Sequence, residues 1–106
     1  MSAPWPPPPD LESIQQLVRE ADIEGHLAEG APADEYEPEE EDLYAAISTW
    51  PTAQLTASSL QPIIEEIWRK SFNLNDSGIA TRSTSIAALA AQIERFFGPE
   101  AKPQVR

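Results

Sequence analysis

A run of carboxylates in the first half of the chain is the stretch whose residue types could do chemistry. From Asp34 to Asp42, seven of nine positions are acidic, and the two exceptions are Tyr36 and Pro38. Carboxylates at this density repel one another, so the segment must face water, a metal ion or a basic partner. The chemistries to consider are therefore calcium binding, acid–base hydrolysis and recognition of a positively charged protein.

Metal binding and hydrolysis each need a pattern that this run lacks. A calcium loop of the helix–loop–helix type needs a glycine at its sixth position, whereas Pro38 and Glu39 stand where that turn would form. Paired catalytic carboxylates need a cleft that separates their pKa values, and a solvated loop provides none. We therefore expect no metal, no cofactor, no catalytic residue and a protein that is not an enzyme.

The other polar residues offer no stronger site. His26 is the single histidine and the chain has no cysteine, so these residues cannot build an ordinary zinc site. The hydroxyl residues around Gly78, at positions 77 and 83–85, match no phosphate-binding loop and are explained by helix capping.

Charge is spread unevenly along the 106 residues, whose net charge is -11. Residues 1–50 hold thirteen acids against the single base Arg19, whereas residues 51–106 hold five acids and six bases. Such a field repels nucleic acid and anionic membranes but attracts a basic protein surface. With no cysteine, no signal-like start and no apolar run of membrane-spanning length, we expect a cytoplasmic protein.

Two tyrosines accompany the acids. Tyr36 lies inside the run, and Tyr44 follows it at a position that the apolar spacing does not demand. Rings among carboxylates are typical of a protein-binding patch, in which the rings are anchors and the charges pair with Lys and Arg. The alternatives are that Tyr36 folds back to pin the loop to the core, and that the acids merely start a helix. The predicted partner-binding residues are Asp34, Glu35, Tyr36, Glu37, Glu39, Glu40 and Tyr44.

Helical periodicity predicts the elements that would position this patch. Asp10 has the place of a cap, and the apolar spacing after it predicts a helix over residues 11–21. A second helix is predicted to begin at Pro38, where the missing amide costs nothing, and to stop at Trp50, since Pro51 follows.

Two more helices are predicted in the second half. The third begins near Ser58 or Ser59, with Pro62 in its first turn, and reaches Phe72. After a turn-rich loop over residues 73–81, the fourth runs over residues 83–97, and Gly98 closes it in the left-handed conformation.

This pattern predicts an all-α fold, because no repeat and no period-two alternation is present. We expect a compact four-helix domain over residues 10–98. A proline-rich N-terminal extension over residues 1–9 precedes it, and a short frayed C-terminal tail over residues 99–106 follows it.

Two runs of the sequence are similar to a known family. They are ADIEGHLAEGAPADEYEPEEEDL at positions 21–43 and LTASSLQPIIEEIWRKSFNL at positions 55–74. The chain resembles the small YugE-like family of bacterial helical proteins, whose members carry a Gly-Ala-Pro-x-Asp-Glu-Tyr-x-Pro-Glu signature before a helix. The matching residues are Gly30, Ala31, Pro32, Asp34, Glu35, Tyr36, Pro38 and Glu39.

The resemblance covers residues 11–75 and extends to aromatic residues late in the third helix, here Trp68 and Phe72. It departs at Asp22 and Ile23, where the family has aspartate followed by proline, and the proline-rich start is not part of the pattern. The family has no settled activity, so the resemblance implies a helical fold and no reaction. It also leaves open that the signature is a structural turn.

Two functional hypotheses follow. The first is a non-enzymatic acidic binding protein, namely an immunity protein that neutralises a basic, nuclease-like bacterial toxin by occluding its active cleft. An acidic patch can occupy such a cleft in place of phosphate. The alternative is a small helical regulatory or adaptor protein that self-associates through the apolar remainder of the third and fourth helices. The sequence leaves the oligomeric state open.

Overall fold

A computed structural model describes residues 8–101 of the chain and shows an all-α fold, as predicted. No β-strand occurs within that range. The expected proline-rich extension and C-terminal tail fall largely on residues 1–7 and 102–106, which lie outside the described residues. The elements are α1 (Leu11–Ala21), α2 (Glu37–Ile47), the short 3-10 helix η1 (Thr52–Gln54), α3 (Ala57–Ser71) and α4 (Asp76–Phe97).

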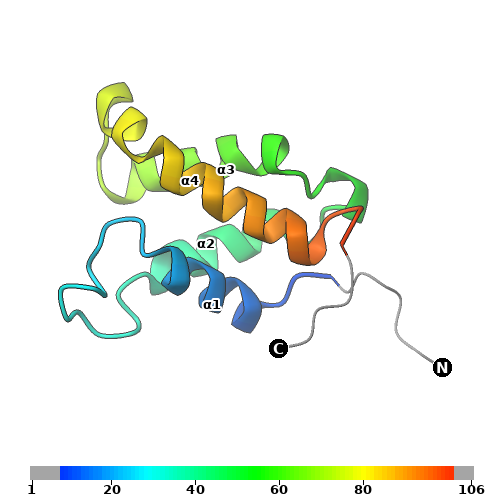
Figure 1. Cartoon of the computed structure of the whole chain (residues 1–106), viewed down its shortest axis with the longest axis horizontal. Coiled ribbons are helices and arrows are strands. Elements are labelled where there is room, and N and C mark those ends of the chain that lie inside the picture. Colours follow the sequence, from blue (N-terminus) through cyan, green and yellow to red (C-terminus); the bar gives the residue numbers. More distant parts are fainter. Residues whose placement is uncertain (1–7, 102–106) are drawn as a thin grey trace.

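The four helices close a ring around one core. Helices α1 and α3 each pack on both α2 and α4. In Figure 1, α3 and α4 lie above α1 and α2, and the long loop that joins α1 to α2 forms one end of the molecule. This loop and the start of α2 contain the whole acidic run.

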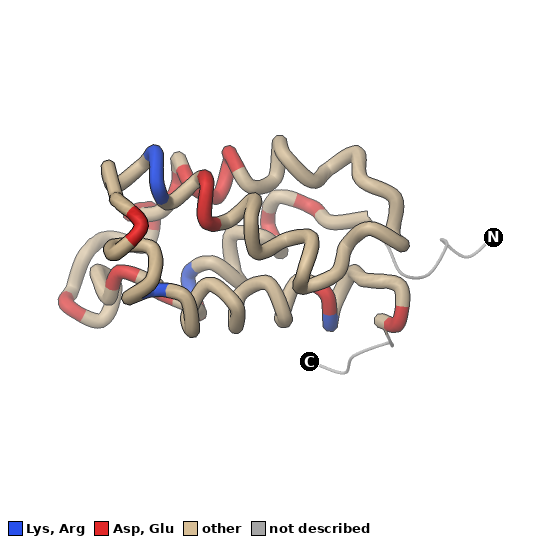
Figure 2. Tube along the Cα trace, turned by 90° about the horizontal axis from the view of Figure 1, so that it is seen from above, with Lys and Arg blue, Asp and Glu red and all other residues tan. Residues whose placement is uncertain are grey.

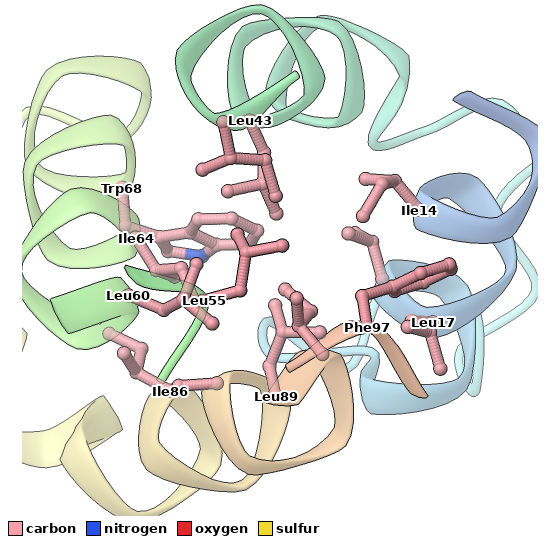
Figure 3. Packing of buried hydrophobic residues seen from close by; sticks show 14 of the residues in the cluster. Ile14, Leu17, Leu43, Leu55, Leu60, Ile64, Trp68, Ile86, Leu89 and Phe97 are labelled. Carbon is pink, nitrogen blue, oxygen red and sulfur yellow. The ribbon is translucent and has the colours of Figure 1, made fainter. Parts of the chain in front are cut away.

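The core is apolar and draws on every helix. Figure 3 shows side chains of α1, α2, α3 and α4 pointing toward a common centre, with Trp68 on one side and Phe97 on another. Apolar residues of α1, α3 and α4 all contribute, although Ile63, Ile67 and Phe72 of α3 and its C-terminal end are only partly buried. The largest side chains that are wholly buried include Trp68, Tyr36, Ile14, Leu43, Ile47, Leu55, Leu60, Ile64, Ile86, Leu89 and Ile93.

The first two helices lie close to their predicted positions. The bounds of α1 are confirmed, and its cap Asp10 accepts a hydrogen bond from the backbone amide of Ser13 at 3.1 Å. Helix α2 begins one residue earlier than predicted, with Pro38 in its first turn, and ends at Ile47 instead of Trp50. The chain turns between them, since the Trp50 amide bonds the Ile47 carbonyl at 3.0 Å.

The start of α3 was predicted slightly too late. Thr56 is the cap, and its hydroxyl accepts from the Ser59 amide at 3.3 Å. Pro62 therefore lies in the second turn and not in the first, so the carbonyl of Ser58 loses its helical hydrogen bond. Pro62 is exposed, which leaves that carbonyl open to water.

Most of the predicted loop over residues 73–81 is helix. Helix α4 begins at Asp76, because Asn75 caps it by accepting from the Gly78 amide at 2.8 Å. Gly78 lies in the first turn, where a glycine costs little, and the next residue, Ile79, is buried in the core. Turn-forming residue types here serve as a cap and a first turn.

Gly98 ends α4 for a different reason from the predicted one. Its φ of -78° and ψ of -178° describe extended backbone and not the left-handed conformation. A Cβ at this position would lie 2.6 Å from the carbonyl oxygens of both Glu94 and Leu55. Close approach of two backbone segments therefore requires the glycine.

Candidate protein-binding surface

The loop over residues 22–36, which carries the first acids, is organised around Asp22. This residue ends α1 in the left-handed conformation with a φ of 42°. Its carboxylate accepts hydrogen bonds from the backbone amides of Leu27 at 3.1 Å and Ala28 at 3.0 Å. Two turns with positive φ at Gly25 and Gly30 allow the chain to fold back on itself.

Tyr36 pins the end of this loop to its beginning. Its ring is wholly buried, and its hydroxyl donates to Asp22 Oδ1 at 2.6 Å. The same hydroxyl accepts from the backbone amides of Glu24 at 3.0 Å and His26 at 3.4 Å. Of the two arrangements expected for Tyr36, the structure shows the one in which it holds the loop to the core.

The hydrogen bond between Tyr36 and Asp22 affects the pKa values of both groups. Burial raises the pKa of Tyr36, and the hydrogen bond to Asp22 adds to the shift. Burial also works to raise the pKa of Asp22, but the hydrogen bonds from Tyr36 and from the Leu27 and Ala28 amides outweigh it and lower the pKa. Both groups therefore keep their neutral-pH forms, a phenol and a carboxylate.

Glu24 ties the middle of the loop to two helices. Arg82 of α4 binds its carboxylate through two nitrogens, at 2.5 Å from Nε and 2.8 Å from Nη2. The indole nitrogen of Trp68 in α3 donates to the same carboxylate at 3.0 Å. The hydrogen bond from Arg82 is the main cause that lowers the pKa of Glu24, whose side chain is only 8% exposed.

His26 lies at the rim of this network. Its ring stacks on Tyr36 at a centroid distance of 5.8 Å, and its Nδ1 lies 3.3 Å from a carboxylate oxygen of Glu35. Together with Glu29 and Ala31, these two side chains line a shallow, open hollow on the loop surface. His26 therefore contacts the acidic run, with one of its carboxylates within ion-pair distance.

Glu40, in the first turn of α2, is fully buried. Arg19 of α1 binds it through two nitrogens, from Nε to Oε2 at 3.0 Å and from Nη2 to Oε1 at 3.3 Å. The side chain of Glu40 is 0% exposed, whereas that of Arg19 is 34% exposed. Glu40 joins two helices and offers no surface to a partner.

Glu39, beside it, is also buried but has a different environment. Its exposed fraction is 6%, and the hydroxyl of Ser71 at the end of α3 faces its carboxylate. Burial is the largest influence and raises the pKa of Glu39, with Ser71 acting in the opposite direction. The negative charges of Asp42, Glu40 and Glu35 add to the rise.

The predicted partner-binding residues therefore fall into a buried group and an exposed group. Tyr36 and Glu40 were predicted to contact a partner, but both are wholly buried because they hold the loop and α1 in place. Glu39 keeps only a small exposed edge, and Tyr44 is partly buried. The carboxylates that do face outward are Asp34, Glu35, Glu37, Glu41 and Asp42.

The outward carboxylates come from the end of the loop and from one face of α2. Glu37 and Glu41 lie one turn apart on that helix, and Tyr44 follows one turn later. Helix α2 contains no Lys or Arg. In Figure 2, charged positions gather toward the end of the molecule where the loop lies. The arrangement can attract and pair with cationic groups.

Sequence reasoning missed the residues that hold this surface in shape. Glu24 and Arg82 lie 58 positions apart, and nothing in either local pattern connects them. Arg19 carried a signal, since it is the single base in the first fifty residues and therefore a natural partner for a buried acid. Within residues 8–101, the structure gathers no group of three or more His, Asp or Glu side chains that could hold a metal ion.

Comparison with known proteins identifies no relative: no family model, curated protein or solved structure matches the chain. The resemblance to the YugE-like family therefore remains a prediction. Among the helices in the described part of the chain, none has both the length and the apolar character needed to cross a membrane.

Proposed function

We propose that this chain is a non-enzymatic acidic binding protein, and specifically an immunity protein that neutralises a basic, nuclease-like bacterial toxin by occluding its active cleft. One observation carries the proposal. Asp34, Glu37, Glu41 and Asp42 are exposed, and none of them forms an ion pair with another described residue. Uncompensated charge of one sign on one surface favours association with the opposite sign.

The fold holds the backbone beneath these exposed carboxylates in a fixed position. Glu37 and Glu41 lie on a helix that packs against both α1 and α3, and Asp34 lies in the loop that Tyr36 and Glu24 anchor. Charges held in fixed positions lose little conformational freedom on binding, which favours affinity. The ring of Tyr44, partly exposed one turn beyond Glu41, supplies an aromatic anchor.

The test is charge reversal on the outward face. Asp34, Glu37 and Glu41 are changed to Lys together, and the chain is mixed with a basic, nuclease-like toxin domain from the same bacterium. We expect the natural chain to suppress the nuclease activity at equimolar ratio and the triple variant to fail, since each reversal replaces an attraction by a repulsion. Circular dichroism checks that the helices remain.

The matched control reverses three exposed acids elsewhere, namely Glu12, Glu20 and Glu100. This variant has the same net charge as the triple variant, so it separates the local surface from the overall field. Retained inhibition in the control and loss in the triple variant support the proposal. Full inhibition by the variant with Asp34, Glu37 and Glu41 reversed would refute it.

The second candidate is a helical regulatory or adaptor protein that self-associates. It is favoured by apolar side chains of α3 and α4 that are only partly buried, such as Ile63, Ile67 and Phe96. The net charge of -11 opposes contact between two copies, most strongly at low salt. Light scattering distinguishes the candidates, because a stable dimer at both low and high salt supports self-association.

A further inference from the structure

The loop over residues 22–36 contains one side chain that can become positive, namely His26. No Lys or Arg occurs in this loop, and Arg19, the single base of the first fifty residues, is bound to the buried Glu40. Histidine is the side chain whose charge ordinarily changes between about pH 5 and 8. Any positive charge on a side chain of this loop therefore comes from His26.

The fold holds His26 in one place. Its amide donates to the Tyr36 hydroxyl at 3.4 Å, and its carbonyl accepts from the amides of Glu29 at 3.2 Å and Ala31 at 3.0 Å. Its ring stacks on the wholly buried ring of Tyr36 with 2° between the two planes, and it meets the ring of Phe72 edge-on at a centroid distance of 6.2 Å. The imidazole is thus fixed on both sides, although the side chain is still 35% exposed.

The imidazole lies next to an exposed carboxylate of the acidic run. Its Nδ1 is 3.3 Å from Oε1 of Glu35, whose side chain is 40% exposed. Both side chains line the open hollow on the loop surface together with Glu29, which is also exposed. A proton on the imidazole therefore places a positive charge among carboxylates that face outward.

The other charged groups near the imidazole already have partners. The titratable groups that face it belong to the loop itself and are Asp22, Glu24, Glu29, Glu35 and Tyr36. Of these, Asp22 is bound by the Tyr36 hydroxyl and Glu24 by Arg82 of α4. From the end of α3, the uncharged ring of Phe72 contacts the imidazole. Glu29 and Glu35 are left as the exposed carboxylates whose charge a proton on His26 offsets.

We propose that His26 is a pH-sensitive switch, which weakens binding of the basic partner when its imidazole takes up a proton. This inference rests on the proposed function and deepens it. Above the titration range of the imidazole, Glu35 and Glu29 are available to attract Lys and Arg of a partner. As the pH falls, the imidazolium pairs with Glu35 and repels the same cationic groups, so the affinity decreases.

The test measures the affinity of a hexa-arginine peptide by fluorescence anisotropy at about pH 7.5 and about pH 5.5. We expect the natural chain to bind about threefold more weakly at the lower pH, which is the size of effect expected for one exposed ion pair. His26→Gln keeps a polar side chain without the charge, and its affinity should change by less than about 1.5-fold. Burial raises the pKa of Glu39, so this carboxylate also gains protons on acidification, but both chains retain it and the comparison isolates the imidazole.

Two arginine substitutions test whether the position of the charge matters. His26→Arg places a permanent charge in the loop, and its planar guanidinium can stack on Tyr36. Gln92→Arg adds the same charge at an exposed position of α4, about 15 Å along the helix from Arg82. At about 100 mM salt, screening limits electrostatic effects to about 10 Å. At about pH 7.5 we expect His26→Arg to bind the peptide about threefold more weakly than the natural chain, and Gln92→Arg to differ by less than about 1.5-fold. Circular dichroism checks that each variant keeps its helices.

The switch and the proposed function fail in distinguishable ways. The switch is overturned if acidification weakens binding equally in the natural chain and in His26→Gln, or leaves the natural chain unaffected. Equal weakening by His26→Arg and Gln92→Arg also overturns it, because only net charge would then matter. These results leave the proposed function intact, since that fails when reversal of Asp34, Glu37 and Glu41 leaves toxin inhibition unchanged. A loss in acid that is absent from His26→Gln, together with weak binding by His26→Arg at both pH values, supports the switch.

Discussion

Replacing Arg19 should show how much its ion pair with Glu40, a buried member of the acidic run, contributes to the stability of the fold. In Arg19→Met, the carboxylate of Glu40 loses both of its cationic contacts, at 3.0 and 3.3 Å, while remaining 0% exposed. A buried charge left without its partner costs about 3–5 kcal/mol. Because Arg19 is itself 34% exposed, solvent screens part of the interaction, and we expect the lower end of that range.

The assay is urea unfolding followed by circular dichroism at the helix band. We expect Arg19→Met to lower the free energy of unfolding by about 3 kcal/mol at pH 7. At about 4 °C per kcal/mol, this corresponds to a fall in Tm of roughly 12 °C.

Two controls define the refuting result. Arg95→Met removes an exposed arginine and should change stability by less than about 0.5 kcal/mol. The double variant Arg19→Met with Glu40→Met replaces the pair by apolar groups and should recover most of the loss. If Arg19→Met costs no more than Arg95→Met, the claim that Glu40 depends on its partner is wrong.

Two further substitutions test the loop anchor and the end of α4. Glu24→Gln should cost about 2 kcal/mol at pH 7, because it replaces a carboxylate that Arg82 and Trp68 both bind. The pKa of Glu24 is lowered in the folded state, so its contribution to the free energy of unfolding is fully present above the ordinary glutamate pKa and is lost as the pH falls through the lowered value. The difference in stability between Glu24→Gln and the natural chain, measured by urea unfolding, should therefore become smaller in acid. Gly98→Ala should lower the free energy of unfolding by about 2 kcal/mol, because its Cβ would meet the Glu94 and Leu55 carbonyls; unchanged thermal unfolding would contradict this close approach.

Local patterns predicted most of the fold. The apolar spacing and the cap Asp10 were enough to place α1, and helical periodicity also predicted the helix α3, which contains the wholly buried Trp68. The start of α4 was missed because Asn75, Ser77 and Gly78 are residue types shared by turns and helix starts. Only the packing of Ile79 in the core decides between the two.

The candidate surface was less predictable, because its division depends on contacts between distant parts of the chain. Consecutive glutamates have the same local pattern, yet Glu40 meets Arg19 of α1, Glu39 meets Ser71 of α3 and Glu41 faces water. Helical phase alone assigns them to different sides of α2 but does not say which side is covered. That information comes from how the helices pack on one another.

The association rate with a basic toxin domain tests the central claim most directly, namely that the outward carboxylates exist to meet positive charge on another molecule. Stopped-flow mixing from about 20 to 300 mM salt spans weak to strong screening. We predict a rate that falls steeply with salt for the natural chain, and a slow, nearly salt-independent rate when Asp34, Glu37 and Glu41 are reversed. Association that is equally fast for both chains at every salt concentration would contradict the account.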